Sequence, residues 1–229
     1  MAGADVIPVS AFVRHSSVWV TVTPTMEQVV RAANSMQESL GRAVPSLSDS
    51  QRNALIAETA FLLAGAGFPE THIRKPELEA KARDFLMRLP RSEGSEASLS
   101  SDEWVEVGML AQVTRLYSSR LDQPNFSPKI PGCGVVDAAT GDILCGTELV
   151  EIKTVTRPFR AYDIRQAVTY SAMLYASDYT VERITLLNPR RARFVSMSLD
   201  EIAAATRGES KVALMQDLVE CMVSLQVSA

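Results

Sequence analysis

The sequence predicts an α/β protein in which a mixed central sheet is flanked by helices, with a mostly helical N-terminal portion. Apolar residues recur at helical spacing through much of the first hundred residues, and strand-like segments gather between residues 132 and 197. Residues 91–100, the one stretch rich in small polar residues, suggest a division between a helical portion, 1–100, and a core, 101–229.

The composition is that of an ordinary globular protein. Of the 229 residues, 46% are hydrophobic and 22% charged, and the net charge of -4 gives no overall attraction to nucleic acid. Three cysteines form no CxxC pair, which favours a reducing compartment. Since no apolar run approaches the roughly 20 residues of a membrane span, we expect a soluble, cytoplasmic protein with no membrane partner.

The N-terminal portion opens with a β-rich segment, residues 17–23, for which we expect a strand. Pro24 then begins a helix with apolar residues at helical spacing. Either Ser48 or Asp49 caps a second helix, and Pro76 opens a third. We therefore expect helices over residues 24–41, 49–65 and 76–89.

The core begins with a helix over residues 101–121, which has acidic residues in its first turn. A hairpin should follow, with Asp137 near the end of its first strand, residues 139–142 in its turn and residues 143–145 as its second strand. A buried strand is expected over residues 149–155, because its side chains alternate.

The remaining elements alternate between helix and strand. The pattern predicts a helix over residues 162–176 and two further strands, over residues 182–187 and 192–197. A short helix that opens at residues 198–201 and a last helix over residues 210–226 follow. Ser198 and Glu201 form a capping-box pattern for the first of these last two helices. The final helix is amphipathic and could close the core or pair with a second copy of the chain.

Two charges lie on the predicted buried strand. Glu151 and Lys153 point to the same face, because side chains alternate along a strand. Burying either charge alone costs roughly several kcal/mol, so the pair should act with water, a metal or each other. Mg²⁺ prefers oxygen ligands, and Asp137, Glu151 and the Ile152 carbonyl are candidates for a site that hydrolyses phosphodiesters.

Two choices stay open at this point. Lys153 would orient or deprotonate the attacking water, or stabilise the charge of the transition state. Asp142 is a rival to Asp137 as a ligand, although a place in the predicted turn would leave it in solvent.

Asp137, followed after 13 residues by Glu151-Ile152-Lys153, resembles the signature of the PD-(D/E)XK nuclease superfamily, and Gln166-Ala167-Val168-Thr169-Tyr170 is similar to the QxxxY element of its RecB-like branch. The resemblance spans roughly residues 102–194. It implies a restriction-endonuclease-like core, dependence on Mg²⁺ or Mn²⁺, and cleavage of DNA or, less often, RNA. Bacterial defence, mobile-element biology and DNA repair are the settings that it suggests.

The resemblance also implies a role for each matching residue. Asp137 and Glu151 would bind the metal, Lys153 would be the catalytic lysine, and Gln166 and Tyr170 would organise the active site. On the preceding helix, Glu106 matches an acidic residue that many members place there, although Glu103 lies equally near. At the motif's proline this chain has Val136.

Basic residues cluster in two short stretches. These are the arginines at positions Arg157, Arg160, Arg165, Arg190, Arg191 and Arg193. If they flank the same opening, they supply phosphate contacts that the acidic chain otherwise lacks. The alternative to a nuclease is a non-catalytic subunit of the same fold that binds a protein partner through its helical portion.

Overall fold

The computed structural model describes residues 6–67, 74–88 and 97–225. Within these ranges six strands form a mixed sheet in the order β1-β8-β7-β6-β5-β2, so the protein is α/β as the sequence predicts. These strands are β1 (Glu38–Ser39), β2 (Asn125–Phe126), β5 (Ile143–Cys145), β6 (Glu148–Ile152), β7 (Arg183–Asn188) and β8 (Arg193–Ser198). β6 and β7 are parallel and the other neighbours antiparallel. A separate pair joins β3 (Lys129–Ile130) to β4 (Ala139–Thr140).

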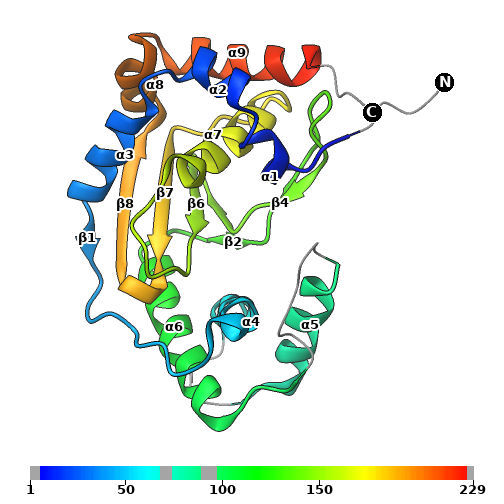
Figure 1. Ribbon diagram of the computed structural model, residues 1–229, viewed down its shortest axis with the longest axis vertical. Coiled ribbons are helices and arrows are strands. Elements are labelled where there is room, and N and C mark those ends of the chain that lie inside the picture. Colours follow the sequence, from blue (N-terminus) through cyan, green and yellow to red (C-terminus); the bar gives the residue numbers. More distant parts are fainter. Residues whose placement is uncertain (1–5, 68–73, 89–96, 226–229) are drawn as a thin grey trace, which may run out of the picture.

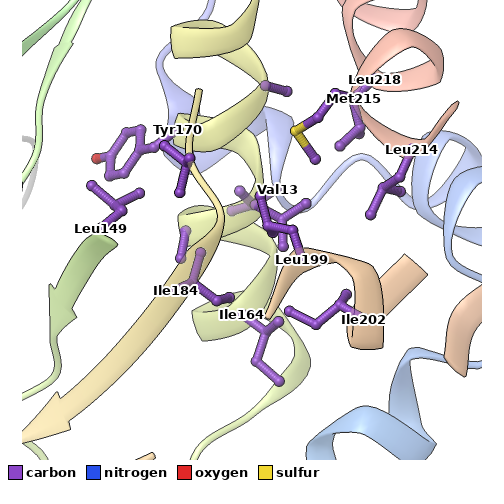
Figure 2. Close-up of a cluster of buried hydrophobic side chains, with 14 of the residues drawn as sticks. Val13, Leu149, Ile164, Tyr170, Ile184, Leu199, Ile202, Leu214, Met215 and Leu218 are labelled. Carbon is purple, nitrogen blue, oxygen red and sulfur yellow. The ribbon is translucent and has the colours of Figure 1, made fainter. Parts of the chain in front are cut away.

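One face of the sheet is covered by α7 (Ala161–Tyr175) and by helices packed around it. The surrounding helices are α1 (Val9–Phe12), α2 (Ser16–Val22), α3 (Met26–Ser35), α8 (Leu199–Arg207) and α9 (Lys211–Ser224). Figure 2 shows the core between them, in which Leu149 and Ile184 from the strands meet Ile164 and Tyr170 from α7. This packing buries the α7 side of β6, the side on which Glu151 also lies.

The opposite face of the sheet packs on α6 (Ser101–Ser118), where Tyr117 joins a cluster with Val150 and Leu187. The first half of α6 also packs with α4 (Asn53–Gly65) and α5 (Pro76–Leu86), which follow the short helix η1 (Ser50–Arg52). We call α4 and α5 the helical lobe. In Figure 1 the lobe lies below the sheet. No helix in the described part of the chain is long and apolar enough to cross a membrane.

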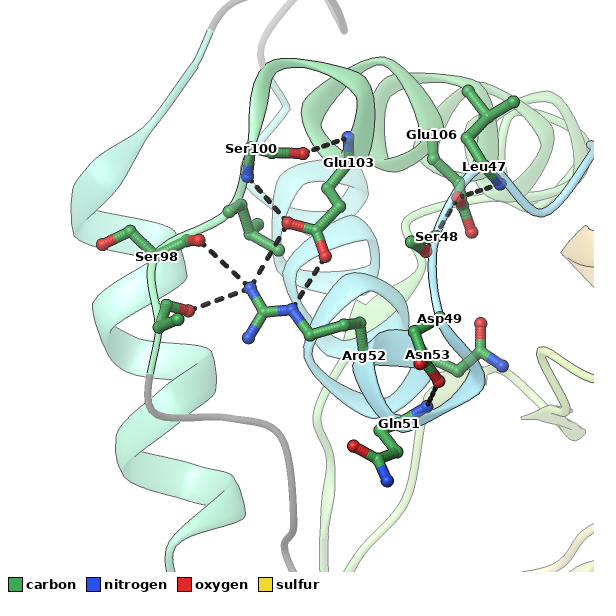
Figure 3. A network of polar contacts seen from close by, with 12 residues as sticks. Leu47, Ser48, Asp49, Gln51, Arg52, Asn53, Ser98, Ser100, Glu103 and Glu106 are labelled. Carbon is green, nitrogen blue, oxygen red and sulfur yellow. Dashed lines mark hydrogen bonds and ion pairs between the residues drawn. The ribbon is translucent and has the colours of Figure 1, made fainter.

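An ion pair joins the start of α4 to the start of α6. Arg52 Nε donates to Glu103 Oε1 at 2.7 Å, and the same guanidinium reaches the carbonyl oxygens of Ala97 and Ser98 (Figure 3). Glu103 also closes a capping box with Ser100, which fixes the beginning of α6. These contacts hold the lobe against the helix that supports the sheet.

Residues 17–22 lie in α2 and Thr23 caps it, so the strand expected over residues 17–23 is wrong. Val18, Trp19 and Val22 are buried on one side of this helix, and Trp19 Nε1 donates to the Phe12 carbonyl at 3.0 Å. A buried helical face outweighs the β propensity of these residues. The helices α1, α2 and α3 belong to the main core cluster. Most of the predicted linker, residues 91–100, lies outside the described residues.

The hairpin differs from the predicted one in the place of its turn. β5 and β6 pair directly, with Ile143 opposite Val150 and Cys145 opposite Glu148, so the chain turns at Gly146 and Thr147. Gly146 has a φ of 52°, a conformation that glycine adopts without strain. Asp142 therefore stands directly before β5, at the level of Glu151, and not at the tip of a hairpin.

Candidate active site

Glu151 and Lys153 lie side by side at the carboxyl end of β6. The Lys153 ammonium donates to Glu151 Oε1 over 2.8 Å. Glu151 is 3% exposed, because α7 covers this face of the strand. Because side chains alternate along a strand, Glu151 and Lys153 share one face of β6, as the sequence predicts, and they form a partly buried ion pair there.

Gln166 and Tyr170, one helical turn apart on α7, extend this pair into a chain of hydrogen bonds. Lys153 Nζ also donates to Gln166 Oε1 at 2.8 Å, and Gln166 Nε2 donates to the Tyr170 hydroxyl at 3.1 Å. Burial, and then the charge of Glu151, raise the pKa of Tyr170 well above its ordinary value. Tyr170 thus stays neutral and fixes the amide that holds Lys153.

Asp142 is the second carboxylate beside Glu151. Its Oδ2 accepts a hydrogen bond from the backbone N–H of Ile152 at 2.6 Å, across the β5–β6 pair. Burial raises the pKa of Asp142 well above its ordinary value, and the negative charge of Glu151 raises it further. The carboxyl groups of Asp142 and Glu151 therefore lie close together where water has little access. Keeping both of them charged there costs free energy unless a positive charge lies beside them.

Asp137, the first choice from the sequence, lies elsewhere. It is exposed, its Oδ1 accepts from the backbone N–H of Ala138 at 2.7 Å, and its own N–H donates to the Ile7 carbonyl. The structure thus groups Asp142, the rival, with Glu151. The sequence pattern favours Asp137 because its turn residues predict a hairpin turn at residues 139–142, which would leave Asp142 in solvent. Asp142 instead stands before β5, which pairs with β6 around a turn at Gly146 and Thr147.

The oxygen atoms present fit a divalent cation. Glu151 Oε2 is buried with no hydrogen-bond partner, although Oε1 is taken by Lys153. An unsatisfied buried carboxylate oxygen next to a second carboxylate is the donor set that a hard cation prefers. Among the described residues no group of three or more His, Cys, Asp or Glu side chains could hold a metal. Mg²⁺ commonly keeps several waters and is bound through one or two carboxylates.

The site opens into a pocket of about 490 Å³ between the end of β6 and the helical lobe. Its lining comes from α4, α5, the start of β5 and the chain after β6, namely Asn53, Ala54, Ala57, Glu58, Phe61, Phe85, Leu86, Asp142, Ile152, Lys153, Thr154 and Val155. Asp142 and Lys153 thus reach solvent here, while Glu151 lies behind them.

Glu58 is a pocket residue that no sequence motif singles out. Burial raises its pKa from 4.5 to about 7, and its charge contributes to the raised pKa of Asp142. A signal was present in the sequence, since Glu58 is the only charged residue of the helix Asn53–Gly65. Because a carboxyl group is costly to bury, an acid within an otherwise apolar helix more often has a specific role than an acid on a polar surface.

Both acids proposed on α6 are engaged away from the pocket. Glu106 is fully buried, forms an ion pair with Arg190, and accepts from the Leu47 N–H at 2.7 Å (Figure 3). Glu103 pairs with Arg52. Neither is among the described residues that line the pocket, so the acid that approaches the site comes from α4 instead.

The arginines proposed for phosphate binding do not form one patch. Arg190 is 3% exposed and pairs with Glu106, and Arg157 donates to Asp163 Oδ2 at 2.7 Å. The Arg165 guanidinium lies over the Trp19 ring, 5.4 Å from its centroid. Arg160 is exposed and Arg191 half-buried, as solvated arginines usually are.

Comparison of the chain with models of protein families, with curated proteins and with solved structures finds no match. The functional assignment therefore depends on the geometry of the residues themselves.

Proposed function

We propose that the protein is a metal-dependent nuclease that hydrolyses phosphodiester bonds of DNA, with RNA the less favoured substrate. The observation that carries the proposal is the hydrogen-bonded chain from Glu151 through Lys153 and Gln166 to Tyr170, with Asp142 beside it. The Glu151-Ile152-Lys153 element and the Gln166 and Tyr170 pair resemble those of PD-(D/E)XK nucleases, with Asp142 in the place first given to Asp137. The order of helix, strands, helix and strand supports a restriction-endonuclease-like core.

Asp142 and Glu151 would hold the Mg²⁺ or Mn²⁺ ion, with the Ile152 carbonyl as a third oxygen. When bound, the ion supplies positive charge that stabilises the phosphate oxygens as the transition state forms. The protein's own contribution is to fix these carboxylates. The Ile152 N–H fixes one oxygen of Asp142, and Lys153 fixes one oxygen of Glu151.

Lys153 acts here as a cationic hydrogen-bond donor. Burial alone would lower its pKa, but the charges of Glu151 and Asp142 outweigh burial and raise it, so the amine carries its proton at neutral pH. It lines the pocket and could donate to a phosphate oxygen or to the attacking water. Gln166 limits the directions that the flexible side chain can take.

The proposal is tested by incubating the purified protein with labelled single- and double-stranded DNA and RNA in Mg²⁺, Mn²⁺ or EDTA. We expect cleavage in either metal and none in EDTA. Lys153→Ala should lower the rate at least about 100-fold, because it removes the one cationic side chain among the described residues that line the pocket.

Lys129→Ala is the matched control. Lys129 is exposed on β3 and donates to Thr140 at 3.1 Å, outside the pocket, so its loss should leave the rate within about twofold. Equal rates for the wild type and Lys153→Ala would overturn the site. A folded wild type that cleaves none of the substrates in either metal would overturn the function.

A further inference from the structure

The helical lobe gives the pocket an apolar wall opposite its charged residues. Ala54, Ala57 and Phe61 of α4, with Phe85 and Leu86 of α5, line this side. Phe61 also packs toward the sheet, against the Phe126 ring at 5.6 Å, and Leu86 is buried in the lobe's own core. Phe85 differs, because 44% of it is exposed.

The lobe does not need Phe85 for its own packing. Leu78, Ala82 and Leu86 form the buried face of α5 at helical spacing, and the described cluster that joins α4, α5 and α6 does not include Phe85. An exposed ring that faces a pocket beside proposed catalytic groups is available to a ligand. Its flat apolar surface suits another flat ring.

The charges at the pocket disfavour a duplex as the ligand. Lys153 is the one cation among the described lining residues, whereas Glu58 and Asp142 are acids. Recognition of duplex DNA uses many contacts from cations to phosphates, and Arg157 and Arg190 are engaged by acids of the protein itself. Single strands are held differently, by aromatic rings on which bases stack.

The size of the pocket also favours a single-stranded ligand. A volume of about 490 Å³ falls within the range of roughly 300–1,000 Å³ that is usual for small-ligand sites. Such a space suits a nucleotide unit, whereas the bases of a duplex are paired and stacked and would have to leave the helix to reach Phe85.

We propose that the helical lobe forms a nucleobase subsite in which Phe85 stacks on the base next to the phosphate held by Lys153, so that the substrate is single-stranded nucleic acid. This inference rests on the proposed nuclease function and adds the class of substrate. Stacking does not read the sugar, so single-stranded DNA and RNA share the chemistry.

The test measures binding separately from cleavage. The anisotropy of a fluorescein-labelled single-stranded DNA is followed in EDTA with the wild type, Phe85→Ala, Phe85→Trp and the control Met87→Ala. Met87 is 59% exposed just after α5 and does not line the pocket. We expect Phe85→Ala to weaken binding about 5- to 100-fold, and Phe85→Trp and Met87→Ala to stay within about threefold of the wild type.

Two further probes identify stacking as the cause. A single-stranded RNA should show the same loss in Phe85→Ala, and an oligonucleotide of abasic sugars should bind the wild type and Phe85→Ala equally weakly. A wild type that binds or cleaves a duplex better than single strands would overturn the inference. So would undiminished binding of the single-stranded DNA by Phe85→Ala, or a failure of tryptophan to restore it.

Different results would contradict the nucleobase subsite and the nuclease function. If the wild type cleaves nucleic acid with metal and Phe85→Ala does so equally on single strands, the subsite is wrong and the nuclease stands. If the wild type neither binds nor cleaves any of the probes, both fail.

Discussion

Lys153 Nζ donates to Gln166 Oε1 over 2.8 Å and thereby joins the end of β6 to the middle of α7. Gln166 is held in turn by the Tyr170 hydroxyl. The lysine therefore has two anchors, one carboxylate and one amide, and the amide is itself anchored. This arrangement makes Gln166 and Tyr170 positioning residues for Lys153.

We expect Gln166→Ala to lower kcat about 10- to 100-fold with little change in KM, because Lys153 loses its orientation and not its charge. Tyr170→Phe keeps the buried ring and removes only the hydroxyl, so a loss within about tenfold is expected. Single-turnover cleavage with saturating enzyme measures both effects.

The double variant tests whether Tyr170 acts through Gln166. Once Gln166 is alanine, the Tyr170 hydroxyl has lost its partner, so adding Tyr170→Phe should lower the rate by less than about twofold. Two full and multiplicative losses would show that Tyr170 contributes independently, which contradicts its positioning role.

Glu58 should make folding stability depend on pH. Its pKa is about 7 in the folded protein against 4.5 ordinarily, so the folded state keeps a proton that the unfolded chain releases. This contribution is complete below about pH 4.5 and is lost as the pH rises through 7. Glu58→Gln should thus match the wild type near pH 4.5 and exceed its unfolding free energy by about 1–3 kcal/mol at pH 8.

Urea denaturation at the two pH values measures this difference. Glu38→Gln is the control, since Glu38 is exposed on the edge strand β1 and should give similar differences at both. A Glu58→Gln variant that is no more stable than the wild type at pH 8 would contradict the burial of this carboxyl group.

The sequence predicts which site residues share a face of a strand or helix when those residues are close in sequence. Glu151 and Lys153 are two apart on a strand, and Gln166 and Tyr170 four apart on a helix, so the period of each element places each pair on one face. The strands β5 to β8 and most helices after residue 24 follow from similarly local patterns of apolar residues, caps and prolines. The helix expected over residues 24–41 ends at Ser35 instead, because Glu38 and Ser39 pair with β8 as the edge strand β1.

The site residues whose positions the sequence does not predict depend on contacts between segments that are far apart in the chain. Choosing Asp142 over Asp137 requires the β5–β6 register, which follows from a two-residue turn whose position competing turn signals obscured. Glu58 reaches the pocket only because α4 packs on α6. The ion pair of Glu106 with Arg190 joins segments that no short motif connects.

Arg190 should be structural. It pairs with Glu106, which is fully buried, and its Nη1 donates to the Pro45 carbonyl at 3.0 Å. Arg190→Met leaves that carboxylate without its partner, so we expect the unfolding free energy to fall by about 3–5 kcal/mol. Arg191→Met, at the neighbouring half-buried position, should change it by less than about 1 kcal/mol.

Chemical denaturation together with DNA binding separates the two roles of Arg190. A variant Arg190→Met of unchanged stability but weakened DNA binding would restore the phosphate contact suggested by the sequence and contradict the structural role.

The most direct test of the proposed metal site compares Asp142 and Asp137 in one cleavage assay with Mg²⁺. Asp142→Asn keeps an acceptor for the Ile152 N–H but removes the charge beside Glu151, whereas Asp137→Asn changes an exposed loop. We expect Asp142→Asn to lose at least about 100-fold in rate and Asp137→Asn to stay within about twofold of the wild type. An active Asp142→Asn beside an inactive Asp137→Asn would contradict the site described above.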